Sequence, residues 1–99
     1  MRLIIHGRVQ GVGYRDWLVH TAHLHRLHGW VRNLTDGAVE AVLAGPEATL
    51  MACLAACQKG PPMAKVSRIE TLPYEQEVPP AFERKQTTTP SRQGQDKCL

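Results

Sequence analysis

The residues best suited to chemistry lie near the start of the chain, in the run Gly7-Arg8-Val9-Gln10-Gly11-Val12-Gly13-Tyr14-Arg15. An alternating apolar stretch precedes this run and an amphipathic stretch follows it, which predicts a strand, a glycine-bearing loop and a helix start. Gly11 and Gly13 tolerate positive φ, so successive backbone N–H groups can turn inward and line a concave anion site. The helix start adds unpaired N–H groups, and Arg15 adds a planar fork of donors that matches two phosphate oxygens. The run therefore predicts an oxyanion site whose phosphate-binding residues are Gln10, Gly11, Val12, Gly13, Tyr14 and Arg15.

Two better-known phosphate loops are excluded by their spacing. A P-loop ends in Gly-Lys-Ser/Thr, whereas this chain continues as Tyr14-Arg15-Asp16. A dinucleotide-binding fingerprint needs a glycine three residues after Gly13, where the chain has Asp16. For the loop alone, one plain alternative stays open: a strand-to-helix turn whose glycines only satisfy backbone geometry.

A second candidate is Asn33, which lies on a predicted strand just before a hairpin turn. Because a carboxamide both donates and accepts hydrogen bonds, Asn33 can hold a water molecule without taking its proton. An isolated asparagine near a turn is more often a solvent-facing polar residue. The functional interpretation therefore depends on its combination with the glycine loop.

Hydrophobic periodicity and turn residues predict the elements that would position these side chains. Strands are expected at residues 2–9, 29–35, 38–44 and 64–72, a short last strand at Phe82, and helices at 14–26 and from Pro46 to the Gly60-Pro61-Pro62 stop. Asp36-Gly37 predicts a two-residue hairpin turn in which both residues accept positive φ. The order βαββαβ is the split βαβ arrangement, an α+β fold with an antiparallel sheet and both helices on one face. Such a fold hosts many functions and cannot name one.

Composition predicts one domain at residues 1–85 and a disordered tail at 86–99, where the chain offers little to bury. Neither a secretory signal nor an apolar run of membrane-spanning length is found, so we expect a cytoplasmic protein with no membrane partner. The three cysteines do not form a disulfide framework. Small size favours a monomer. The net charge of +3 is too mild for a nucleic-acid-binding signature.

Together, the two motifs resemble those of the acylphosphatase family. The run from Gly7 to Arg15 looks like the family's phosphate loop, and Gly29-Trp30-Val31-Arg32-Asn33-x-x-x-Gly37-x-Val39 looks like its water-positioning strand. The resemblance covers roughly residues 3–85. It implies a ferredoxin-like sandwich that hydrolyses the carboxyl–phosphate bond of acyl phosphates without metal or cofactor, with Arg15 and Asn33 as the catalytic residues.

The chain also departs from the family pattern at two places. Where members usually have Leu-Gly-Leu at the end of the first helix, this chain has His25-Arg26-Leu27. An arginine that takes the glycine's left-handed conformation costs roughly 1 kcal/mol or more. The last strand carries Arg84 where an apolar residue is common, which predicts a short strand or an edge position.

The implied reaction needs few groups. The leaving group is a carboxylate with a pKa of about 4, so it departs without a general acid. Backbone N–H groups and the Arg15 guanidinium would stabilise the phosphoryl oxygens, while Asn33 would orient the attacking water. In the family the substrate's own phosphate receives the water's proton. The expected partners are a small acyl phosphate as substrate and inorganic phosphate as product and inhibitor.

Two other function classes remain as alternatives. A non-catalytic phosphate- or nucleotide-binding module would keep the loop but release no phosphate. A nucleic-acid-binding domain of this fold would present aromatic residues on its sheet, and the chain has no aromatic run on a strand.

Two further sets of side chains have a simpler explanation than a functional one. His20, His23, His25 and His28 lie in or near the first helix, but zinc ligands usually converge from more than one element, so no metal is expected. Cys53 and Cys57 lie on the apolar face of the second helix, where buried cysteines act as small hydrophobes.

Overall fold

Residues 1–90, the part of the chain that the structure describes, follow the predicted βαββαβ order and end in the predicted short strand at Phe82. The computed structural model contains β1 (Arg2–Arg8), α1 (Tyr14–Leu24), β2 (His28–Asn33), β3 (Val39–Ala44), α2 (Glu47–Cys57), β4 (Lys65–Leu72) and β5 (Phe82–Arg84). Each element lies within two residues of its predicted bounds. No helix in this part of the chain is long and apolar enough to cross a membrane.

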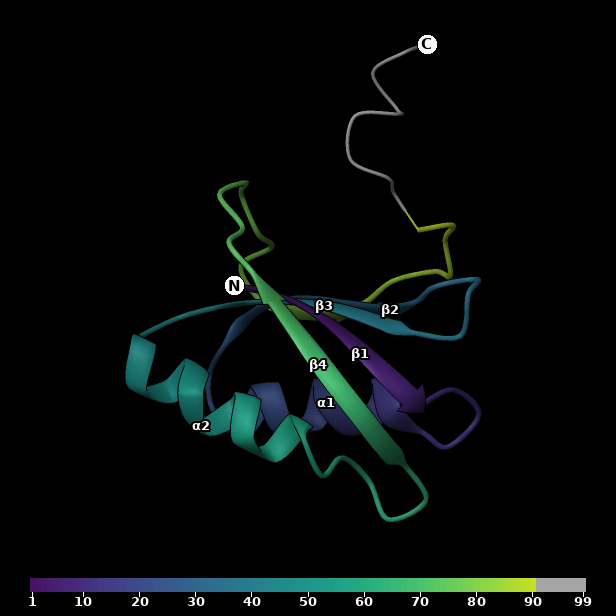
Figure 1. The fold of residues 1–99 in the computed structure, drawn as a ribbon. Helices are drawn as coiled ribbons and strands as arrows, with labels where there is room; N and C mark the ends of the chain where they lie inside the picture. The colour runs from purple at the N-terminus through teal and green to yellow at the C-terminus, as the bar shows by residue number, and fades with distance from the viewer. Residues whose placement is uncertain (91–99) are drawn as a thin grey trace, which may run out of the picture.

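The strands form one sheet in the order β4-β1-β3-β2-β5, and both helices pack on the same face of it (Figure 1). The pairs β1–β3, β1–β4 and β2–β3 are antiparallel, as predicted. The exception is β5, which pairs parallel to β2 and makes the sheet mixed. Because β4 and β5 lie at opposite edges, residues 73–81 must cross the sheet, and they do so over the face without helices.

Alternation along the central strands explains which face is covered. The helix-facing residues of β1 and β3 are fully buried: Leu3, Ile5, Val39, Ala41 and Leu43. Leu18 and Ala22 of α1 and Cys53 and Cys57 of α2 complete the same core, each 0 % exposed. The predicted packing role of the two cysteines is thereby confirmed.

The two helices are joined by the side chain of Tyr14. Its ring is 1 % exposed, and its hydroxyl donates a hydrogen bond to the Cys57 carbonyl oxygen at 2.6 Å, at the end of α2. Burial, together with the neighbouring Cys57, raises the pKa of the Tyr14 hydroxyl, so it stays protonated as a donor. This bond satisfies a carbonyl that the end of a helix would otherwise leave without a partner.

The hairpin turn differs from its prediction. The N–H of Leu34 donates to the Ala38 carbonyl oxygen at 2.8 Å, and the N–H of Gly37 donates to the Leu34 carbonyl oxygen at 3.2 Å. These bonds enclose a three-residue loop in which only Gly37 has positive φ, at 100°. The predicted two-residue turn at Asp36-Gly37 is wrong. Such a turn needs positive φ at both residues, and Asp36 does not have it. Its carboxylate instead accepts a hydrogen bond from the Ala38 N–H at 3.0 Å.

Residues 86–90 of the predicted tail continue along the sheet. Thr88 forms an isolated parallel bridge with Leu34, and its N–H donates to the Asn33 carbonyl oxygen at 3.1 Å. The rest of the predicted tail, residues 91–99, lies outside the described residues. The domain boundary at residue 85 and the disorder of the tail stay predictions.

Arg26 ends α1 in the left-handed conformation that the sequence suggested, with φ 57°. The N–H of Leu27 donates to the Ala22 carbonyl oxygen at 2.9 Å and that of Arg26 donates to the His23 carbonyl oxygen at 3.0 Å. This bond pair defines a Schellman motif, which favours glycine at the position of Arg26.

We expect Arg26→Gly to raise the free energy of unfolding by about 0.5–1 kcal/mol, since relief of left-handed strain exceeds the added entropy of the unfolded chain. Urea denaturation followed by circular dichroism measures the change. Arg26→Asn, a residue that also tolerates this conformation, should give a smaller gain. A loss of stability in Arg26→Gly would contradict the strain.

Candidate active site

The loop between β1 and α1 has the backbone conformation of an anion-binding nest. Gly11 and Gly13 have φ values of 74° and 80°, whereas Gln10 and Val12 do not have positive φ. This alternation turns successive N–H groups toward one side of the chain. A Cβ atom built on Gly11 or Gly13 would meet no protein atom within 4 Å, so glycine is required here by backbone conformation and not by packing.

The loop ends at the N-terminus of α1, which adds further donors. Gly13 is the N-cap residue and has no side chain to bond the first-turn N–H groups. The N–H groups of Tyr14, Arg15 and Asp16 are thus available to an anion, and the partial positive charge of the helix end favours one.

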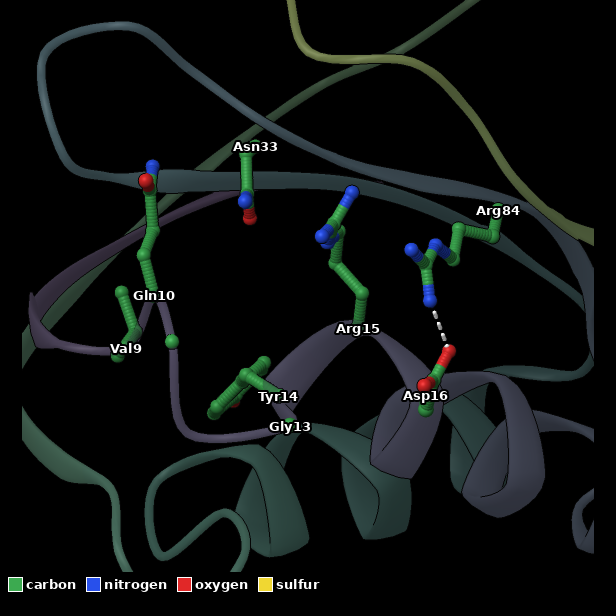
Figure 2. Close-up of a pocket in the computed structure, with 9 residues that line it drawn as sticks. Val9, Gln10, Gly13, Tyr14, Arg15, Asp16, Asn33 and Arg84 are labelled. Atoms are coloured by element: carbon green, nitrogen blue, oxygen red, sulfur yellow. Dashed lines mark hydrogen bonds and ion pairs between the residues drawn. The ribbon is translucent and has the colours of Figure 1, made fainter.

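A hollow of about 90 Å³ lies above the loop, between α1 and the end of β2 (Figure 2). Since a water molecule takes up about 30 Å³ in the liquid, the hollow suits a group of a few heavy atoms. Residues from three elements and the loop line it: Val9, Gln10, Gly11, Gly13, Tyr14, Arg15, Asp16, Asn33 and Arg84.

The hollow brings together most of the predicted site residues. Arg15 and Asn33, which are 18 positions apart in the chain, both line it, and in Figure 2 their side chains point into the space between α1 and β2. Val12 is not a lining residue, and Tyr14 turns its ring into the core, so both could contribute only main-chain N–H groups. Their role as phosphate ligands stays a prediction.

Asn33 presents an unusual acceptor. It is the last residue of β2 and pairs with Val39, whose side chain is buried on the helix-facing side of the sheet. Its Oδ1 atom is buried and has no hydrogen-bond partner within residues 1–90. Leaving such an atom unpaired costs about 1–3 kcal/mol, and buried polar atoms nearly always have a partner. The carboxamide is therefore placed to accept a hydrogen bond from a molecule in the hollow.

The side chain of Gln10 has a structural role in addition to the predicted main-chain role, which stays a prediction. Its Nε2 atom donates to the Leu34 carbonyl oxygen at 2.7 Å and to the Ala38 carbonyl oxygen at 2.8 Å. Both amide hydrogens are thereby used, so only the backbone N–H of Gln10 remains for an anion. The side chain joins the loop to the hairpin that carries Asn33.

Three lining residues were not among the predicted site residues, namely Val9, Asp16 and Arg84, and Arg84 comes from the most distant part of the chain. Its Nη1 donates to Oδ1 of Asp16, so that the pair joins β5 to the first turn of α1. No local pattern reveals this neighbour, because it depends on the parallel pairing of β5 with β2.

Two of the four histidines singled out from the sequence have contacts to backbone carbonyls. The Nε2 atom of His23 lies 3.2 Å from the Phe82 carbonyl oxygen, and Nδ1 of His25 lies 3.0 Å from the Thr21 carbonyl oxygen. Within residues 1–90, no group of three or more His, Cys, Asp or Glu side chains is arranged to hold a metal ion.

Comparison with known proteins gives a consistent result. The family model described as Acylphosphatase matches residues 1–84. An acylphosphatase of Rhodopseudomonas palustris is 57% identical over 68 residues, which cover 69% of each chain. One of Rhodospirillum rubrum is 49% identical over 81 residues, which cover 82% of this chain and 89% of the relative. The crystal structure of acylphosphatase from Bacillus subtilis superposes with a TM-score of 0.80 at 39% identity and covers 85% of this chain and 94% of that one.

We expect Gln10→Met to lower the free energy of unfolding by about 1–2 kcal/mol, since the two hydrogen bonds that join the loop to the hairpin are lost, although both carbonyl oxygens keep their partners within the hairpin. Affinity for inorganic phosphate should stay within about threefold, because the backbone N–H of Gln10 remains available to the anion. The side chain affects the site only by joining the loop to the hairpin. Urea denaturation and isothermal titration calorimetry measure the two effects. Gln58→Met, at an exposed glutamine, is the matched control. A large loss of phosphate affinity with unchanged stability would show that the Gln10 side chain binds phosphate and does not serve to join the loop to the hairpin.

Proposed function

Since the chain belongs to the acylphosphatase family and hydrolyses the carboxyl–phosphate bond of acyl phosphates, we propose that Arg15 and Asn33 catalyse this reaction in the hollow above the glycine loop. The proposal rests on one observation in particular. The unpaired Oδ1 of Asn33 lies in the wall of the same small hollow as the Arg15 guanidinium and the nest.

The phosphoryl group would lie in the nest. Main-chain N–H groups of residues 10–15 would donate to its oxygens, and Arg15 would donate two parallel hydrogen bonds from its planar guanidinium. These donors are fixed before the substrate arrives, so they stabilise the charge that spreads over the equatorial oxygens in the transition state.

Asn33 would hold the attacking water. One water hydrogen would be donated to the buried Oδ1, which leaves an oxygen lone pair free to attack phosphorus. The new P–O bond forms as the bond to the acyl oxygen breaks, and the carboxylate leaves with the bonding electrons. The substrate's phosphate takes the water's proton, so the scheme uses no protein base, metal or cofactor.

The setting of the reaction belongs to the same proposal. We expect the protein to act as a cytoplasmic monomer on a small substrate, without a nucleic-acid partner.

Arg15→Ala should lower kcat/KM for benzoyl phosphate by about 10²–10³-fold, the usual effect of removing a fixed transition-state donor, and should also weaken inorganic phosphate binding. Arg15→Lys should recover little, because an ammonium group cannot donate the paired bonds. Ultraviolet absorbance follows the hydrolysis, and Arg68→Ala, at an exposed arginine of β4, controls for charge. Unchanged phosphate affinity in Arg15→Ala would refute the assignment.

Asn33→Ala should lower kcat by about 10²-fold while affinity for inorganic phosphate stays near that of the unaltered protein, since the lost contact is to the water and not to the phosphoryl group. Thr35→Ala, at an exposed residue of the same hairpin, is the control. Hydrolysis at the unaltered rate would mean that another group positions the water. If the unaltered protein bound phosphate without hydrolysing benzoyl phosphate, it would be a binding module.

A further inference from the structure

Arg84 brings a second guanidinium to the hollow, from the strand at the edge of the sheet. In the parallel register of β5 and β2, Phe82 pairs with Gly29 and Arg84 pairs with Val31. Phe82 and Val31 are buried in the core, so Arg84 also leaves its strand on the helix-facing side. The side chain passes along the rim of the hollow, where it is 46% exposed.

The ion pair with Asp16 leaves Arg84 with capacity for another anion. Within the described residues its one side-chain hydrogen bond joins Nη1 to Asp16, whereas a guanidinium has five donors. The Asp16 carboxylate is 72% exposed, and such exposed pairs contribute little to stability. Arg15, Arg84 and Asp16 together give the wall a net charge of +1.

The shape of the site sets where the acyl group lies. A hollow of about 90 Å³ accommodates the phosphoryl group, so the acyl group must extend past the rim. Attack in line places the leaving group opposite the water, that is, away from Asn33. In Figure 2, Arg15 stands between Asn33 and Arg84, so Arg84 lies on the side of the hollow away from Asn33, toward which the acyl group would depart.

We propose that Arg84 determines substrate specificity and favours acyl phosphates whose acyl group carries a second anionic group. This inference rests on the proposed function, because the position of the acyl group follows from it. The second anion, a carboxylate or a phosphate, accepts hydrogen bonds from the donors of Arg84 that Asp16 does not use.

The test compares kcat/KM for 3- and 4-carboxybenzoyl phosphate with that for benzoyl phosphate. The ratio of carboxylated to plain substrate should fall about fivefold in Arg84→Gln for at least one isomer, the effect of one exposed charge pair. Effects on the phosphoryl group are common to both substrates and cancel in the ratio. Raising the salt concentration should lower the ratio of the unaltered protein and leave that of Arg84→Gln unchanged.

Two further variants separate the effect of Arg84 on this ratio from that of Asp16. Asp16→Asn removes the charged partner of Arg84 and should raise the ratio. The double variant Arg84→Gln/Asp16→Asn should have a ratio as low as that of Arg84→Gln. Arg68→Gln, with the same loss of charge on β4, should leave the ratio as it is. A ratio unmoved by Arg84→Gln for both isomers overturns the inference while benzoyl phosphate hydrolysis still supports the proposed function. No hydrolysis of benzoyl phosphate by the unaltered protein would overturn both.

Discussion

The site depends on a fixed separation between the glycine loop and the end of β2. β1 and β2 both pair antiparallel with β3, which lies between them. They therefore run in the same direction, and their C-terminal ends lie on the same side of the sheet. Two strand spacings of about 4.8 Å therefore separate the loop from Asn33. The Gln10 side chain spans this gap and bonds two carbonyls of the hairpin. Strand order and one amide thus hold the nest facing Asn33.

Two features of this arrangement oppose stability. Gly11 and Gly13 take positive φ with no packing gain, since no protein atom lies near the position of a Cβ atom. Asn33 keeps an unpaired buried oxygen. Local strain and unsatisfied groups of this kind persist at functional sites where the surrounding structure holds them in place. Here the core below the sheet and the Tyr14 bond between the helices provide that support.

The predictable parts of this protein are those with local signals. Alternation and helical periodicity predict β1, α1, β3 and α2, and the residue types of the loop and Asn33 predict an anion site and a water-holding amide. The hairpin loop has one residue more than predicted, because Asp36-Gly37 is compatible with both a two-residue and a three-residue loop. The hydrogen bond from the Ala38 N–H to the Asp36 carboxylate accompanies the longer loop. The hydrogen bonds of the Gln10 side chain and the position of Arg84 beside the hollow could not be predicted, because both depend on segments that are far apart in sequence.

The parallel pairing of β5 and the segment after it with β2 also holds Asn33 in position. The N–H of Lys85 donates to the Val31 carbonyl oxygen at 2.7 Å, and that of Thr88 donates to the Asn33 carbonyl oxygen at 3.1 Å. The backbone of Asn33 is therefore bonded on both sides, by β3 and by the segment after β5, although composition alone assigned residues 86–90 to a tail. A strand paired on both sides opens less readily than an edge strand. The segment that places Arg84 at the rim thus also fixes the strand that carries Asn33.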